Sequence, residues 1–208
     1  MHSELAFFSA LIAMMNPVGN AGLFVSLTAS TTRHRRTRVA LVAGFAAALI
    51  GIVSQFAGGA LLYGMHVSID ALRLAGGLFL LQVGLAMLRG ESHHAHSADD
   101  QRHAEQFDDP SVVPVAMPLL MGPGAIALII SAAHQSTGIY AEAWMSSAIL
   151  IASGLCAITF VFAGPLAERL GPAGLKIVTR LMGLVIAAIA VQMIVDGGLA
   201  LVQSHSDP

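Results

Sequence analysis

The chain has few charged residues: only 11% of its 208 residues are Asp, Glu, Lys or Arg, whereas 56% are hydrophobic. Soluble globular domains usually carry about 25% charged residues, so this composition excludes a soluble protein. The formal net charge of −2 also argues against the basic patch or stripe of a nucleic-acid-binding domain. We therefore expect an integral membrane protein that binds no nucleic acid.

Cysteine is represented by one residue, Cys156. A single thiol can form neither an internal disulfide nor a cysteine metal cage. A membrane oxidoreductase that exchanges disulfides needs two thiols, so that alternative lacks its second thiol. The HExxH zinc motif and a membrane aspartate pair are missing as well, which excludes intramembrane proteolysis. We expect no enzyme activity.

Acidic residues and lysine are missing from the middle of the apolar runs. Asp196 and Asp70 come nearest, close to the ends of their runs. This absence argues against a proton pump built around a buried carboxylate relay.

Six apolar runs are each long enough, or nearly so, to cross a hydrocarbon core of about 30 Å as a helix. Their continuous apolar character favours helices over the alternating strands of a membrane barrel. The sequence therefore predicts an all-α integral membrane fold with six transmembrane helices. The runs cover residues 5–28, 39–63, 71–88, 112–133, 144–163 and 178–202.

The basic residues predict the orientation of the chain. Four arginines lie in an expected loop between the first two runs, and the positive-inside rule places such a loop in the cytoplasm. The first run lacks a preceding cationic segment, so we expect it to be retained rather than removed as a signal peptide. Both termini then lie outside. The basic residues expected inside are Arg33, Arg35, Arg36, Arg38, Arg89, Arg102, Arg169, Lys176 and Arg180.

Two short patterns recur half a chain apart. The Pro/Gly segment 16–20 has a counterpart at 122–126, and the segment 73–76 has one at 180–183. Each half holds three spans, an odd number, so the second copy must enter the membrane from the opposite side. The sequence thus predicts a 3+3 inverted-topology repeat, the plan of many secondary transporters. Its parts are residues 1–90, a linker at 91–110, and residues 111–208.

The linker at 91–110 is rich in histidine and acidic residues. Histidine tracts can bind metal ions, which leaves a divalent-metal exporter as an alternative function. The segment has almost no apolar content, which favours a flexible cytoplasmic linker between the two halves. Its histidines are His93, His94, His96 and His103.

The Pro/Gly segments predict breaks in the first and fourth helices. A proline within a helix removes a hydrogen bond, and lipid tolerates the freed groups only where they face protein or a water-filled cavity. Free N–H groups suit a carboxylate and free carbonyls suit an ammonium group, so a zwitterionic amino acid matches both. We expect the substrate at the two breaks, with two glutamines and two arginines as peripheral contributors. These candidates are Asn16, Pro17, Gly19, Asn20, Gly122, Pro123, Gly124, Ala125, Gln82, Gln192, Arg73 and Arg180.

The segments 16–20, 72–78, 115–127 and 180–183 together resemble the MarC family of bacterial and archaeal inner-membrane proteins. The resemblance covers nearly the whole chain, including the six spans and the polar central loop. It implies a place in the LysE-like transporter superfamily, with three-plus-three inverted repeats and broken first and fourth helices. An archaeal branch of the family takes up small neutral amino acids such as glycine and alanine.

This resemblance implies a secondary transporter of the plasma (inner) membrane that works by alternating access. Its expected partners are the lipid bilayer, a small-molecule substrate and, in a homo-oligomer, further copies of the chain. No cofactor and no metal ion is expected at the site. A non-transporting membrane subunit is a further alternative.

Overall fold

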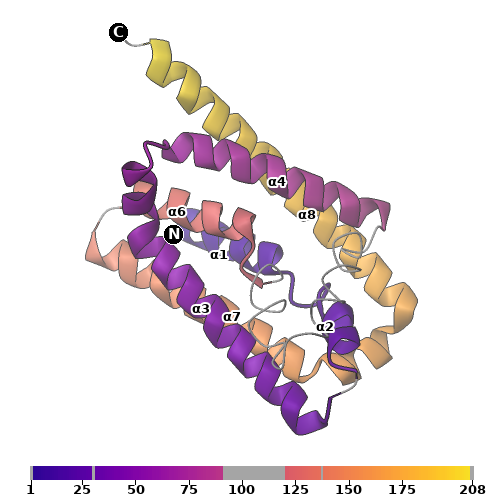
Figure 1. Ribbon diagram of the computed structural model, residues 1–208. Coiled ribbons are helices and arrows are strands. Elements are labelled where there is room, and N and C mark those ends of the chain that lie inside the picture. The colour runs from indigo at the N-terminus through magenta and orange to yellow at the C-terminus, as the bar shows by residue number, and fades with distance from the viewer. Residues whose placement is uncertain (1, 30, 91–119, 137, 207–208) are drawn as a thin grey trace.

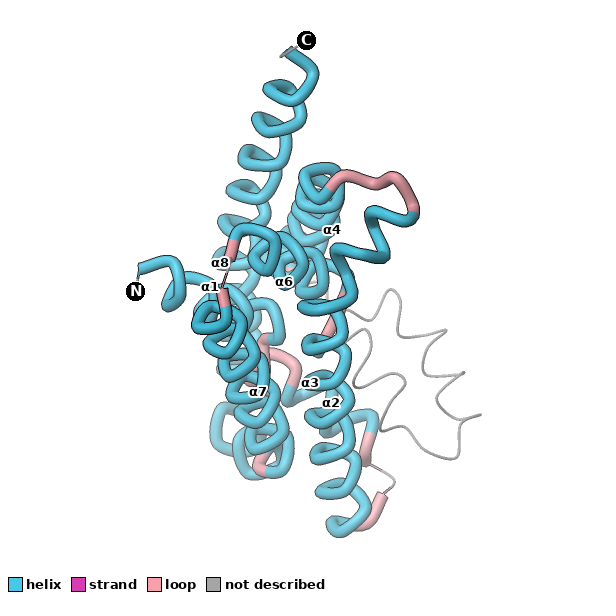
Figure 2. Tube along the Cα trace, turned by 90° about the vertical axis from the view of Figure 1, so that its left-hand side faces the viewer, coloured by secondary structure: helices cyan, strands magenta, loops and turns pink. Residues whose placement is uncertain are grey.

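The computed structural model describes residues 2–29, 31–90, 120–136 and 138–206, and these form helices and short loops without a strand (Figure 1 and Figure 2). The all-α prediction is confirmed for this part of the chain. The helices, in chain order, are α1 (His2–Met15), α2 (Ala21–Leu27), α3 (Arg33–Gly64), α4 (Ile69–Arg89), α6 (Pro123–Gln135), α7 (Ile139–Val161) and α8 (Ala163–Ser206).

Among the described residues, four helices are long and apolar enough to cross a membrane: α3, α4, α7 and α8. This finding supports a multi-pass membrane protein. The first expected span, 5–28, is a pair of short helices, α1 and α2, separated at residues 16–20, where the sequence predicts a break. Of the fourth expected span, 112–133, residues 112–119 lie outside the described residues and α6 forms most of the remainder.

The arginine-rich segment is not the loop that the sequence predicts, because α3 already begins at Arg33. The Thr32 hydroxyl accepts a hydrogen bond from the Arg35 N–H at 3.4 Å, and threonine is a favoured helix N-cap. Arginine is also a good helix former. With 32 residues, α3 is about 48 Å long at the helical rise, so its charged first turns extend beyond a hydrocarbon core.

The expected loop at 164–177 is also helical, which corrects a second boundary. Helix α8 begins at Ala163 and is interrupted only at Gly171, where φ is 63° and ψ is 174°. Glycine adopts this conformation without a Cβ penalty, and the following Pro172 suits the first turn of a new helix. The chain therefore turns at Gly171 and continues as one long helix.

The long helices pack as two antiparallel pairs, α4 with α8 and α3 with α7. A methyl group added at Gly84 of α4 would lie 2.9 Å from the Gly183 carbonyl oxygen of α8, and one added at Gly197 would lie 2.9 Å from the Asp70 carbonyl oxygen. The beginning of α4 thus lies beside the last part of α8, and the end of α4 lies beside the middle of α8, so the two helices run in opposite directions. Glycine permits this close backbone approach, a common means of helix association in membranes.

The second pair, α3 with α7, is joined by polar side chains as well as by small residues. Gln55 of α3 donates from Nε2 to the Glu142 carbonyl oxygen at 3.0 Å and accepts from the Ser146 hydroxyl at 3.1 Å. Gln55 is thus a link between helices, which is the usual role of a polar side chain in a membrane span.

Completely buried side chains from α1, α3, α6 and α7 form the main core of the bundle. Within the same core, Phe24 of α2 stacks on Phe160 of α7 with ring centroids 4.6 Å apart. The beginning of α3 and the ends of α4 and α7 lie at the same end of the bundle as α2 (Figure 1). We call this the basic end, because Arg33, Arg35, Arg36, Arg38 and Arg89 belong to these helix termini.

Candidate functional site

The first break, between α1 and α2, is built around Asn16. This residue is 4% exposed and adopts the left-handed conformation, with φ at 43°, which asparagine tolerates better than most residues. Its N–H still donates to the Ile12 carbonyl oxygen at 2.9 Å, but its side-chain Oδ1 accepts from the Gly19 N–H at 3.2 Å. Asn16 thus ends α1 and holds the turn that follows.

Asn20 satisfies a second backbone group of the same break. In a continuous helix the Met15 carbonyl would accept from the Gly19 N–H, which here is bonded to Asn16. The Asn20 side chain replaces it, because its Nδ2 donates to the Met15 carbonyl oxygen at 3.0 Å. Two backbone groups that the sequence offers for a substrate are therefore already hydrogen-bonded by the two asparagines.

Gly19 is required sterically in this turn. A Cβ at this position would overlap the side-chain amide of Asn16. Any larger residue at position 19 must displace the Asn16 side-chain amide, which accepts a hydrogen bond from the N–H of residue 19. The Asn-Pro-x-Gly-Asn spacing thus encodes one specific turn, in which Pro17 has no N–H to satisfy.

The second break lies at the start of α6 and has a different construction. Gly122 is the extended N-cap residue and Pro123 occupies the first turn, a position that suits proline because the N–H groups there have no intrahelical acceptor. Gly124 and Ala125 are buried. A Cβ at Gly124 would overlap the side chain of Leu80 in α4, so the break is packed against α4 at Gly124, although Pro123 is exposed.

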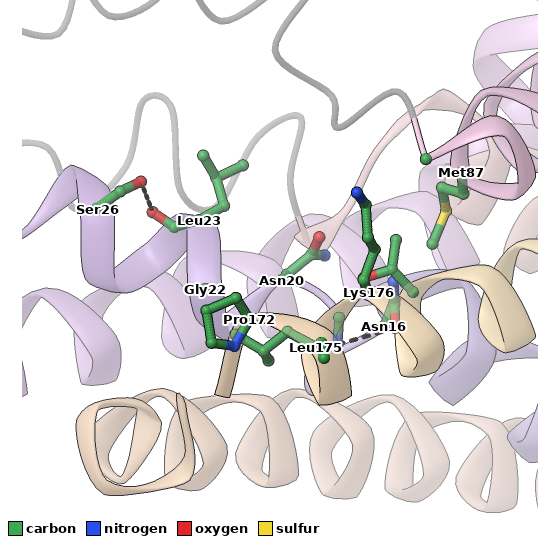
Figure 3. A pocket seen from close by; sticks show the side chains of 13 residues that line it. Asn16, Asn20, Gly22, Leu23, Ser26, Met87, Pro172, Leu175 and Lys176 are labelled. Atoms are coloured by element: carbon green, nitrogen blue, oxygen red, sulfur yellow. Dashed lines mark hydrogen bonds between the residues drawn. The ribbon is translucent and has the colours of Figure 1, made fainter. Parts of the chain in front are cut away.

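A pocket of about 610 Å³ opens beside the first break. Figure 3 shows that its wall comes from the break and α2, from the end of α4 and from the turn of α8 near Pro172. Lys176 is the charged residue among the described lining residues. The lining residues are Asn16, Gly19, Asn20, Gly22, Leu23, Ser26, Met87, Gly90, Pro172, Ala173, Leu175, Lys176 and Thr179.

Of the residues that the sequence proposes for the site, the pocket gathers Asn16, Gly19 and Asn20. Pro17 belongs to the same turn but is not part of the wall. The four residues of the second break, Gly122 to Ala125, do not line this pocket.

The four peripheral candidates are dispersed. Gln82 is exposed on α4. Gln192 donates to Asp196 at 2.8 Å on the exposed side of α8, and Arg73 forms an ion pair with Asp70 at 3.3 Å. Arg180 lies nearest to the pocket, because its Nη2 would be 3.3 Å from a Cβ at the lining residue Gly90.

Lys176 and Thr179 line the pocket but are not among the site residues that the sequence predicts. Both follow the turn at Gly171, and it is this turn that brings the start of the long helix to the first break. The dipeptide Gly171-Pro172 is a strong sequence signal for a helix interruption. If this dipeptide is taken as a third helix break, the sequence predicts that the residues after it, including Lys176 and Thr179, belong to the site.

The other chemical groups singled out in the sequence contribute no site within the described residues. No group of three or more His, Cys, Asp or Glu side chains is placed to hold a metal ion there. The four histidines His93, His94, His96 and His103 lie outside the described residues. Cys156 is a free thiol that is completely buried in α7.

The chain is similar to membrane proteins of bacteria and archaea over almost its full length. It is 34% identical over 190 residues to a UPF0056 membrane protein of Methanocaldococcus jannaschii, covering 91% of this chain and 93% of that protein. It is 33% identical over 194 residues to the UPF0056 membrane protein YvbG of Bacillus subtilis, covering 91% of each. With the UPF0056 inner membrane protein MarC of Citrobacter koseri the identity is 30% over 209 residues, covering 94% of this chain and 93% of the relative.

No solved structure matches this chain. The family model described as MarC family integral membrane protein matches residues 1–202. The resemblance drawn from the short segments is thus confirmed over nearly the entire sequence, and the chain belongs to the MarC family of integral membrane proteins.

Proposed function

We propose that the chain is a secondary transporter that moves small neutral amino acids, of the size of glycine or alanine, or similar small metabolites across the plasma (inner) membrane. The observation that carries this proposal is the pocket that reaches the first helix break from the basic end of the bundle. Many secondary transporters bind their substrates where discontinuous helices meet. A pocket of about 610 Å³ also falls within the usual size range of small-molecule sites.

The chemistry of the wall suits a small polar solute. Asn16 and Asn20 contribute side-chain amides, Ser26 and Thr179 contribute hydroxyl groups, and Lys176 contributes a positive charge. An ammonium side chain is a strong hydrogen-bond donor to a carboxylate. We therefore assign Lys176 to the carboxylate of the substrate and the polar break to its remaining groups.

The helix packing supports a 3+3 inverted repeat. Among the six expected spans, α4 and α8 are the third and sixth, and α3 and α7 are the second and fifth. Each of these helices packs antiparallel against its counterpart. An inverted repeat relates its halves by a two-fold axis in the membrane plane, and this axis makes counterpart helices antiparallel where they meet.

The surroundings of the first break support an inward-open conformation. The break adjoins the main core of the bundle, because Leu11 and Met15 of α1, Ala21 at the start of α2 and Ile129 of α6 are completely buried in one cluster. The positive-inside rule places the basic end in the cytoplasm, so the pocket opens to the cytoplasm and both termini lie outside. Alternating access would close this pocket and open a path from the second break to the outside.

Uptake or exchange of labelled glycine and alanine by liposomes containing the purified protein tests this proposal. We expect transport by the wild type, a marked loss in Lys176→Gln and Thr179→Val, and no change in Ser147→Ala, whose hydroxyl bonds the Trp144 carbonyl at an exposed site. Absence of transport for every small amino acid would contradict the function. Full transport by both pocket variants would contradict the site.

A further inference from the structure

Gln82 places a polar amide on the outward face of α4. The residue is exposed, and no hydrogen bond joins its side chain to another described residue. Seven residues separate it from the end of the helix at Arg89, which is about 10 Å at the helical rise. An amide at that depth lies within a hydrocarbon core of about 30 Å, where it has no water with which to pair.

The residues around Gln82 follow the spacing of a helix-to-helix contact. Ala75, Leu78, Gln82 and Leu85 alternate steps of three and four residues, and all four are exposed. This is the a/d spacing of a coiled-coil seam, with glutamine at an a position. The next position is Arg89 at the helix end, where a long side chain extends into the aqueous layer.

This outward seam is distinct from the face by which α4 joins the bundle. The opposite face carries Gly77, Leu80 and Gly84, which pack against α6 and α8. Helix α4 lies along one edge of the bundle in Figure 1. Among the described residues, no helix packs on this outward seam, so it can meet a second membrane helix.

We propose that this seam, formed by Ala75, Leu78, Gln82 and Leu85, packs against the same seam of a second copy of the chain, with the two Gln82 amides hydrogen-bonded to each other. Two copies with the same orientation in the membrane place their α4 helices in parallel, so the a positions meet at equal depth. An amide carries both a donor and an acceptor, which makes it complementary to its own symmetry mate in a two-fold interface. A single polar residue at an a position fixes register and oligomeric state.

This inference goes beyond the transport proposal and does not depend on it, so its test needs no substrate. Purified protein in liposomes should form covalent dimers on oxidation when Leu78→Cys or Leu85→Cys is introduced. Phe45→Cys on α3, which is 72% exposed, is the matched lipid-facing control and should form no covalent dimer. The wild type should form no covalent dimer either, because Cys156 is completely buried.

Energy transfer between labelled copies, measured over a range of protein-to-lipid ratios, tests the amide itself. We expect Gln82→Leu to weaken self-association about tenfold, since an interhelical side-chain hydrogen bond in a membrane contributes roughly this much, and Gln82→Asn to retain part of it. At protein-to-lipid ratios low enough to keep both proteins monomeric, thermal unfolding of Gln82→Leu should match the wild type, since the residue is exposed in one copy. Three results would overturn the proposal: a monomer at every ratio, equal cross-linking at Phe45→Cys, or unchanged association in Gln82→Leu.

Discussion

The two helix breaks stand at matching places in the sequence but in different surroundings. At the first, Asn16 and Asn20 hydrogen-bond backbone groups of the turn, and one side of the turn opens on the pocket. At the second, the segment 122–125 begins α6 without any polar side chain and packs against Leu80. The same Pro/Gly pattern thus yields an accessible turn in one half and a packed helix start in the other, and the asparagines mark the accessible one.

The largest difference between the two breaks should be the rate at which cysteines introduced there react with a thiol reagent in water. We expect a membrane-impermeant thiol reagent to label Ser26→Cys and Thr179→Cys quickly in inside-out vesicles, because both positions line the pocket. Ala125→Cys, at a position that is 4% exposed, should resist labelling until the protein is denatured. Reaction requires access of the reagent to the thiol, and the buried Cys156 keeps the background low. Equal labelling at the two breaks would contradict the comparison.

The conformation of Asn16 should make the first break sensitive to side-chain chemistry. Asn16→Ala forces alanine into a left-handed conformation, at a cost of about 1–2 kcal/mol, and removes a largely buried hydrogen bond worth about 1 kcal/mol. We expect the free energy of unfolding to fall by about 2–3 kcal/mol. Fluorescence of Trp144, which packs edge-to-face on Phe7, can follow unfolding in mixed micelles.

Asn16→Gly is the matched control for that substitution. Glycine adopts the left-handed conformation freely but still lacks the acceptor for the Gly19 N–H, so only about 1 kcal/mol should be lost. An equal loss in the two variants would show that the backbone conformation at residue 16 is not the cause.

The packed break should instead respond to added volume. In Gly124→Ala the new methyl group overlaps Leu80, and we expect a loss of about 1–3 kcal/mol from overpacking. Leu80→Ala alone leaves a cavity and is also destabilising. The double variant should lose less than the sum of the two, because each change relieves the other, and a double-mutant cycle on the unfolding free energies measures this coupling. If the two losses of unfolding free energy were strictly additive, residues 124 and 80 would not be in contact.

The sequence predicts the long helices well, because every helix that crosses the hydrocarbon core needs a continuous apolar run. It placed their ends less well. The sequence predicts loops for the arginines before residue 39 and for the segment 164–177 because these segments are polar or broken, yet both are largely helical. Polarity shows that a residue leaves the hydrocarbon; it does not show that the helix ends there.

The candidate site was predicted only in part, for a related reason. Asn16, Gly19 and Asn20 form a local turn whose residues are adjacent in the sequence, so their pattern was visible. Lys176 and Thr179 reach the same pocket only because α8 turns at Gly171. The dipeptide Gly171-Pro172 signals a helix interruption, but which other segment this interruption meets depends on tertiary packing.

Gly22→Ala is expected to have the smallest effect, and it tests whether the pocket is open in the resting protein. Gly22 lines the pocket, and a methyl group there would lie 3.4 Å from Leu175 Cδ1, an ordinary van der Waals contact. Alanine also favours a helix over glycine by up to about 1 kcal/mol. We therefore expect the melting temperature to stay constant or rise slightly. If Gly22→Ala were instead destabilised as much as Gly124→Ala, the first break would be packed as tightly as the second, and the difference between the two halves would disappear.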